Sequence, residues 1–142
     1  QILKKNNFTW WNALHLGPQN FLLELIKEVV SKYDVDGIQG DDRLPATPSE
    51  GCYDSYVVSL FKKQFNHKPP EKHKEGSWIR LRADQSSAFG KRVYNKVKSL
   101  SSEVLVSLAP SIYPWTEEKY FQSRINWIKG GYADFIISQF YR

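Results

Sequence analysis

The residues with the clearest chemical potential are two adjacent acids, Asp41 and Asp42, which end the short stretch YDVDGIQGDD at 33–42. A strand that only fills a core would be expected to end in a turn residue. Two carboxylates at such a place can form a polar loop, cap a helix, bind a metal ion or take part in acid and base catalysis. Which of these roles applies depends on the helices and strands that position the two acids.

Further polar and aromatic candidates follow two later apolar segments. Ser111, Tyr113 and Trp115 stand at the end of one such segment, and Gln139 and Tyr141 lie close to the end of the chain. Aromatic rings can stack on flat ligands such as sugar rings, and amide or hydroxyl groups can hydrogen-bond to them. These side chains matter only if the fold brings them near the two acids.

Helical and extended segments alternate along the chain. Apolar spacing predicts helices at 17–32, 53–65, 77–100 and 116–131. β-Rich runs bounded by turn residues predict strands at 35–42, 103–111 and 133–142, with 8–14 as a further candidate. This alternation indicates βαβ units, a parallel sheet and the α/β fold class.

Side-chain alternation along each strand predicts which residues share a face. If Ile38 faces the helices, Gln39 and Asp41 face the other way, which in a closed barrel is the interior. Asp41 then lies at the carboxyl end of its strand, where barrel enzymes keep their chemistry, and Asp42 faces the helices or caps the loop. The same argument predicts that the side chains of Ser111, Gln139 and Tyr141 lie at the carboxyl edge of the sheet with Asp41.

The composition limits the class of protein to which the chain can belong. The chain has 142 residues, of which 41% are hydrophobic and 25% charged, so we expect a single globular domain over 1–142. Lys and Arg exceed Asp and Glu by 20 to 15, which favours acidic partners. The one cysteine, Cys52, excludes an internal disulfide. There is no methionine and the first residue is Gln1, so we expect a piece of a longer polypeptide, without a signal peptide or transmembrane segment in this piece.

Three stretches together resemble one known family. They are WNALHLGPQNFLLELIKEVVSKYDVDGIQGDD, VSLAPSIYPW and ADFIISQFYR, and they resemble the glycosyl-hydrolase-like family 10 group of bacterial TIM-barrel proteins. Family members have an Asn-Pro segment before a long helix, a strand ending in Asp-Asp, a Ser-Pro strand and a strand ending in Pro-Gln-x-Tyr. This chain departs from that pattern at Ala13, Arg43 and Ser138, where the family usually has proline, an aromatic residue and proline.

The resemblance implies a TIM barrel, which needs eight βα units in about 200 residues or more. This chain has three or four such units, so it is expected to be a central portion of a partial TIM barrel with parallel strands. Such a portion exposes two sheet edges and much of an apolar face, and self-association is therefore expected when it is alone.

The resemblance also implies hydrolysis of O-glycosidic bonds in a polysaccharide by carboxylate acid and base catalysis, with no cofactor and no metal. It implies a location outside the cytoplasm, in the periplasm or at the cell surface, with cell-wall glycan as one candidate substrate. Asp41, as nucleophile or general acid, and Asp42 are the expected catalytic residues. The expected substrate-binding residues are Asn12, Ser111, Tyr113, Trp115, Gln139 and Tyr141.

Glycoside hydrolysis commonly uses two carboxyl groups about 5 to 9.5 Å apart. Adjacent strand residues point to opposite faces, so Asp41 and Asp42 are not expected to form that pair. The partner is Glu50 or a residue outside this sequence. Trp10 and Trp11 are expected in the core.

Three other readings stay open from the sequence. A glycan-binding barrel without catalysis would use the same rim, with Asp41 accepting hydrogen bonds from hydroxyls. A nucleic-acid binder would use the basic segment HKPPEKHK at 67–74, but its lysines alternate with prolines and an acid, so no nucleic-acid partner is expected. A cation held by Asp41, Asp42 and Glu50 is chemically conceivable, although their spacing is not that of a calcium loop.

Overall fold

The computed structural model describes residues 3–137 and 139, and its centre is a parallel sheet of three strands. The strands lie in the order β3 (Gly37–Gly40), β4 (Leu105–Leu108) and β5 (Phe135–Ile136). Ile38 is aligned with Val106, and Leu108 with Ile136. The predicted α/β class and parallel pairing are therefore confirmed, while the described residues form an open sheet and no closed barrel.

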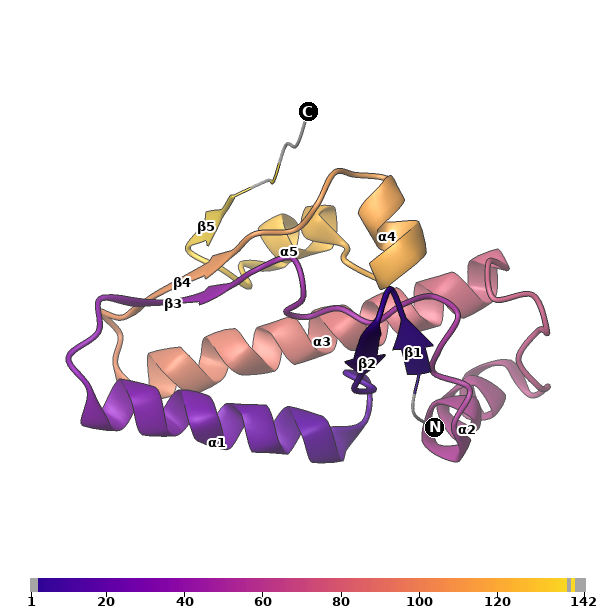
Figure 1. Cartoon of the computed structure of the whole chain (residues 1–142), viewed down its shortest axis with the longest axis horizontal. Coiled ribbons are helices and arrows are strands. Elements are labelled where there is room, and N and C mark those ends of the chain that lie inside the picture. Colours follow the sequence, from indigo (N-terminus) through magenta and orange to yellow (C-terminus); the bar gives the residue numbers. More distant parts are fainter. Residues whose placement is uncertain (1–2, 138, 140–142) are drawn as a thin grey trace.

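Helices cover one face of this sheet (Figure 1). The long helices α1 (Leu16–Lys32) and α3 (Gly76–Leu100) lie along this face, and the shorter helices α2 (Ser55–Phe65), α4 (Trp115–Tyr120) and α5 (Arg124–Gly130) pack on α3. The long helices α1 and α3 pack against each other, and their core with β4 contains Leu23, Ile26, Phe89, Val93, Val97, Val104 and Val106. Ile38 packs on this core, so the predicted alternation of faces along β3 is confirmed.

The opposite face of the sheet is open. Leu105, Phe135 and Ile137 are 44%, 54% and 50% exposed there, beside Gln39 and Ser107, whose side chains are within hydrogen-bonding distance at 3.4 Å. An apolar face of this kind commonly marks a surface that another structural element or partner covers.

The strand predicted at 8–14 is found at 8–10, but it does not extend the parallel sheet, so that part of the prediction is wrong. β1 (Leu3–Lys5) and β2 (Phe8–Trp10) form a separate antiparallel hairpin. Its two-residue turn is Asn6–Asn7, with φ of 52° and 62°. Asparagine tolerates this left-handed conformation better than most residues, and two such residues make the tight turn that matches strand twist.

The single helix predicted over 116–131 is two helices. The chain leaves α4 at Phe121, which has φ of 60°, and α5 starts after Ser123. Gln122 and Ser123 are buried between the two helices, and the Ser123 hydroxyl donates to Glu117 at 3.1 Å. The break directs Gln122 inward, and the predicted stop at the Gly-Gly pair is confirmed by Gly131 in a left-handed cap.

Asp134 ties β5 to β4 at the amino end of the sheet. Its Oδ2 accepts from the Val106 N–H at 2.7 Å and pairs with Lys98 Nζ at 2.9 Å. Partial burial acts to raise the pKa of Asp134, but the hydrogen bonds from Lys98 and Val106 outweigh it, so the pKa lies below its ordinary value. The carboxylate is therefore a pH-dependent element of stability.

Asp134→Asn is expected to lower the free energy of unfolding by on the order of 1 kcal/mol at pH 7. An aspartate with a lowered pKa in the folded state stabilises the folded protein at pH values above the ordinary aspartate pKa of about 3.9. This stabilisation is lost as the pH falls through the folded-state pKa. Urea unfolding should therefore show a difference from the wild type at pH 7 that shrinks below about pH 4. Asp34→Asn, at an exposed position, is the control, and a difference unchanged across this range would contradict the assignment.

Candidate active site

The carboxyl ends of the three strands meet at one edge of the sheet, and we call this edge, with the residues that follow each strand, the rim. Asp41 directly follows β3. The Ala109 N–H donates to the Gly40 carbonyl at 2.7 Å, which continues the pairing beyond β4. Gln139 donates to Pro110 O from its backbone at 3.2 Å and to Ala109 O from its amide at 3.1 Å. The rim therefore brings together Asp41, the segment before Ser111, and Gln139.

Asp41 is an exposed residue in a tight turn. Its Oδ1 accepts from the Arg43 N–H at 2.8 Å, and its carbonyl accepts from the Leu44 N–H at 3.3 Å. Oδ2 has no hydrogen-bond partner among the described residues. One carboxylate oxygen thus fixes the turn, while the other is available to a ligand.

Asp42 is half-buried and connects two loops. Its Oδ2 accepts from Arg43 Nε at 3.2 Å, and its carbonyl accepts from Gln122 Nε2 at 3.0 Å. The Gln122 Oε1 in turn accepts from the Thr116 hydroxyl, and both of these side chains are fully buried. The sequence analysis missed Gln122, because its role depends on the break between α4 and α5.

The segment after β3 and the end of α4 are also joined through the backbone. The Thr47 N–H donates to Tyr120 O at 3.3 Å, and the Ser49 N–H donates to Lys119 O at 2.8 Å. Two loops that both follow strands of the sheet therefore form one surface beside Asp41 and Asp42.

An aromatic row lies along this surface, formed by Trp10, Tyr120 and Trp115. Trp10 stacks on Tyr120 with ring centroids 5.7 Å apart, and Tyr120 lies 5.4 Å from Trp115. Trp115 is 49% exposed and Tyr113, beside it in sequence, is 39% exposed. The sequence predicted Tyr113 and Trp115 as rim residues; Tyr120 carried no separate signal, because it fits the apolar face of the predicted helix equally well.

Glu50, one candidate for the second carboxylate, is paired with Lys5 at 2.7 Å. Burial acts to raise its pKa, but the hydrogen bond and charge of Lys5, together with a backbone hydrogen bond and the charge of His73, outweigh burial and the pKa is lowered. A general acid needs a raised pKa to hold its proton near neutral pH. Glu50 therefore suits an anchor for the hairpin better than a proton donor.

Asn12 has both ends of its side-chain amide engaged. Its Nδ2 donates to Asp54, and its Oδ1 accepts from the Leu14 N–H at 3.0 Å and from Cys52 Sγ at 3.2 Å. Asp54 is the N-cap of α2, accepting from Tyr56 N–H at 3.1 Å. In this arrangement Asn12 holds the starts of two helices together, and its contact with a substrate stays a prediction.

Burial raises the pKa of the Cys52 thiol to about 11, so it is protonated at neutral pH.

Among residues 3–137 and 139, no three His, Cys, Asp or Glu side chains gather in a way that could hold a metal ion. Within the same part of the chain, no helix is both long and apolar enough to cross a membrane.

Ser111 is half-buried at the rim. Tyr141 lies outside the described residues. The predictions for both residues as substrate contacts therefore stand as they were made from the sequence.

The fold and the rim define a parallel α/β protein with a polar and aromatic surface at the carboxyl ends of its strands, the edge where such proteins commonly place their ligands. Comparison with known families then assigns it more narrowly. The chain belongs to the family described as Glycosyl hydrolase-like 10, which matches residues 3–142. No curated protein sequence matches the chain.

Proposed function

We propose that this chain is part of a TIM barrel that hydrolyses O-glycosidic bonds in a polysaccharide, with Asp41 as nucleophile or general acid. Membership of a glycosyl-hydrolase-like family supports the reaction class. The observation that carries the proposal is the position of Asp41, exposed at the carboxyl edge of a parallel sheet with Oδ2 unpaired among the described residues.

The remaining rim residues fit a sugar-binding role in this proposal. Trp115 and Tyr113 are exposed aromatic residues on which a pyranose can stack, with the Arg124 guanidinium 5.7 Å from the Tyr113 ring. Ser111 and Gln139 contribute hydroxyl and amide groups, and Tyr141 would add a further ring. Asp42, paired with Arg43, would position the loop or accept a hydrogen bond from the substrate.

The open sheet face supports the barrel part of the proposal. Leu105, Phe135 and Ile137 would line the interior once other βα units complete the barrel. Those units would also supply the second carboxyl group, since Glu50 is held by Lys5. We propose a location outside the cytoplasm, with cell-wall glycan as a candidate substrate, and the net positive charge of +5 suits an anionic cell wall.

Asp41→Asn tests the proposal in the protein that contains the complete barrel. The release of reducing ends from a polysaccharide is expected to fall at least about 100-fold, since a positioned carboxyl group contributes about that much or more. Asp36→Asn is the matched control, because Asp36 lies at the amino end of the same strand, and it should leave the rate unchanged. Equal rates for the wild type and Asp41→Asn would contradict a catalytic role for Asp41.

A glycan-binding protein without catalysis is the second candidate, favoured by the ion pairs that occupy Asp42 and Glu50. It predicts no release of reducing ends by the wild type, together with saturable polysaccharide binding that Asp41→Asn weakens. Retention of binding with loss of turnover in Asp41→Asn would instead support the hydrolase.

A further inference from the structure

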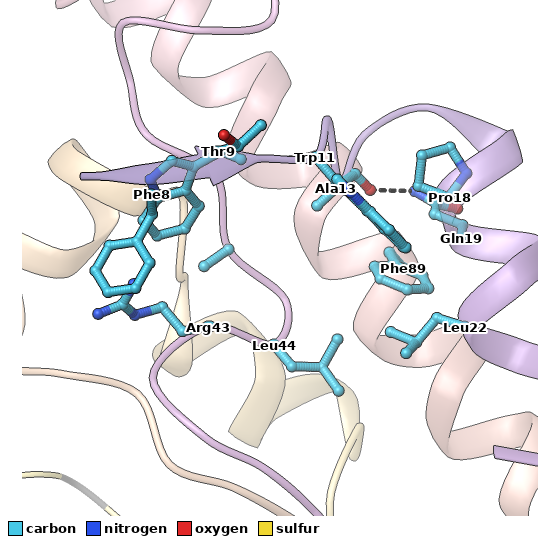
Figure 2. Close-up of a pocket in the computed structure, with 12 residues that line it drawn as sticks. Phe8, Thr9, Trp11, Ala13, Pro18, Gln19, Leu22, Arg43, Leu44 and Phe89 are labelled. Atoms are coloured by element: carbon cyan, nitrogen blue, oxygen red, sulfur yellow. Dashed lines mark hydrogen bonds between the residues drawn. The ribbon is translucent and has the colours of Figure 1, made fainter. Parts of the chain in front are cut away.

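A pocket lies behind the aromatic row, between the hairpin, the start of α1 and the loop after β3. Its volume is about 250 Å³. Figure 2 shows Phe8 and Arg43 on one side of it and Trp11, Leu22 and Phe89 on the other. Its lining also includes Thr9, Trp10, Ala13, Pro18, Gln19, Leu44 and Ala46. No residue proposed above for the hydrolytic reaction lines it.

The walls of this pocket suit one flat ring. Phe8 and Trp11 are 55% and 60% exposed, so the prediction of Trp11 as a core residue is wrong and its ring is open to a ligand. An apolar cavity of about 150 Å³ is enough to bind benzene. A volume of about 250 Å³ therefore has room for a single or fused ring with a short substituent.

The pocket has one charged group, the guanidinium of Arg43. Its Cζ lies 5.1 Å from the Phe8 ring and 5.0 Å from the Trp10 ring, which fixes the charge at the edge of the pocket. Asp42 accepts from Nε at 3.2 Å. Nη1 and Nη2 have no hydrogen-bond partner among the described residues, so two NH₂ groups with four N–H donors remain for an acidic ligand group.

The other polar side chains favour an acid over a sugar here. The Gln19 amide is fully engaged, since its Nε2 donates to Ala13 O at 2.8 Å and its Oε1 accepts from Arg92. Apart from Arg43, the Thr9 hydroxyl and the Trp11 indole N–H are the side-chain polar groups that the lining residues offer to a polyhydroxylated ring. A sugar would lose hydration at several hydroxyls without replacement, which is unfavourable.

From these contacts we infer that the pocket binds a small ring-bearing carboxylic acid, with the ring between Phe8 and Trp11 and the carboxylate on Arg43. This site adjoins the proposed hydrolytic rim, because Arg43 also pairs with Asp42, but none of the residues proposed for hydrolysis lines it. Its occupation can therefore be tested by binding alone, whether or not the protein hydrolyses glycans.

Indole-3-acetate is a suitable probe, with the neutral alcohol indole-3-ethanol as its matched comparison. Isothermal titration calorimetry is expected to show saturable binding of the acid, about tenfold tighter than the alcohol, because a charged hydrogen bond contributes about this factor. Arg43→Gln should remove the tenfold preference and leave alcohol binding unchanged. Trp11→Ala, at an exposed position, should weaken both ligands.

Arg80→Gln is the control for a general loss of positive charge, since Arg80 is exposed on α3 and does not line the pocket. It should bind both ligands as the wild type does. The inference is overturned if the acid does not bind, if acid and alcohol bind equally well, if Arg43→Gln keeps the preference, or if methyl glucoside binds more tightly than the acid. Urea unfolding of each variant shows that a lost affinity is not a lost fold.

Discussion

Arg82→Met is expected to lower the free energy of unfolding by about 4 kcal/mol, a large part of the total stability of a small domain. Arg82 is completely buried. Its guanidinium donates to Ser49 O at 2.7 Å, Gly51 O at 3.0 Å and His73 O at 2.6 Å, and its Nε donates to Trp78 O at 3.1 Å. One side chain therefore joins the loop after β3 and the segment before α3 to the middle of that helix.

The expected loss of stability depends mainly on the backbone carbonyls that lose their hydrogen bonds to Arg82. Methionine has an unbranched chain that fills most of the volume, so the cavity contribution is small. The carbonyls of Ser49, Gly51 and His73 would lose a buried donor, at about 1–3 kcal/mol each. Relief of charge burial offsets part of this loss, because desolvation lowers the pKa of Arg82 to about 10 while leaving it charged at neutral pH.

Urea unfolding of Arg82→Met measures this loss, and Arg80→Met on the exposed side of the same helix is the control. Relative to the wild type, Arg82→Met should speed up hydrogen exchange in the segments around Ser49 and His73. Exchange in α1 should stay the same, because no contact of Arg82 lies there. Wild-type stability for Arg82→Met would show that the carbonyls of Ser49, Gly51 and His73 find other donors, against the assignment.

The helices that pack on the sheet were predictable because their apolar residues repeat at helical spacing. The spacing of Leu22, Ile26 and Val30 predicts α1, and the cap is local as well, since His15 Nδ1 accepts from the Gly17 N–H at 3.1 Å. The parallel strands were predictable from their order between helices. The Asn6–Asn7 hairpin also had a local signal, two residues suited to left-handed backbone, which the search for sheet strands overlooked.

Contacts between distant segments could not be predicted in the same way. Gln122 reaches Asp42 across 80 positions of the chain, and Lys5 reaches Glu50 across 45. Neither pair has a spacing that a local pattern could show. Alternation along β3 predicted that Ile38 packs against the helices, but the partners of Asp42 and Glu50 depend on how the loops pack.

Gly40→Ala is expected to destabilise the protein by about 2–3 kcal/mol, because a methyl group has no room at the end of β3. A Cβ at Gly40 would lie 2.8 Å from the carbonyl oxygen of Leu44 and 2.9 Å from Leu108 Cδ2. Leu108 belongs to the adjacent strand, and Leu44 closes the turn that starts at Asp41. The backbone oxygen cannot rotate away as a side chain can, so the turn itself has to move.

Because the turn has to move, Gly40→Ala also tests whether turnover depends on the exact position of the Asp41 carboxylate at the rim. Because Asp41 is adjacent and its carbonyl accepts from Leu44 N–H, its carboxylate should shift with the turn. A shift of about 1 Å can reduce turnover about 100-fold if Asp41 is catalytic. Amide chemical shifts from Asp41 to Leu44 should change, together with the urea midpoint.

Gly76→Ala is the matched control, since nothing lies within 4 Å of a Cβ at that position and it begins α3. Alanine there should change stability by less than about 1 kcal/mol, and in the stabilising direction, because it restricts the unfolded chain and favours helix. If Gly40→Ala is as stable as Gly76→Ala, the contact between the end of β3 and the Leu44 carbonyl is looser than the structure shows. The position of Asp41 would then not depend on the absence of a side chain at residue 40.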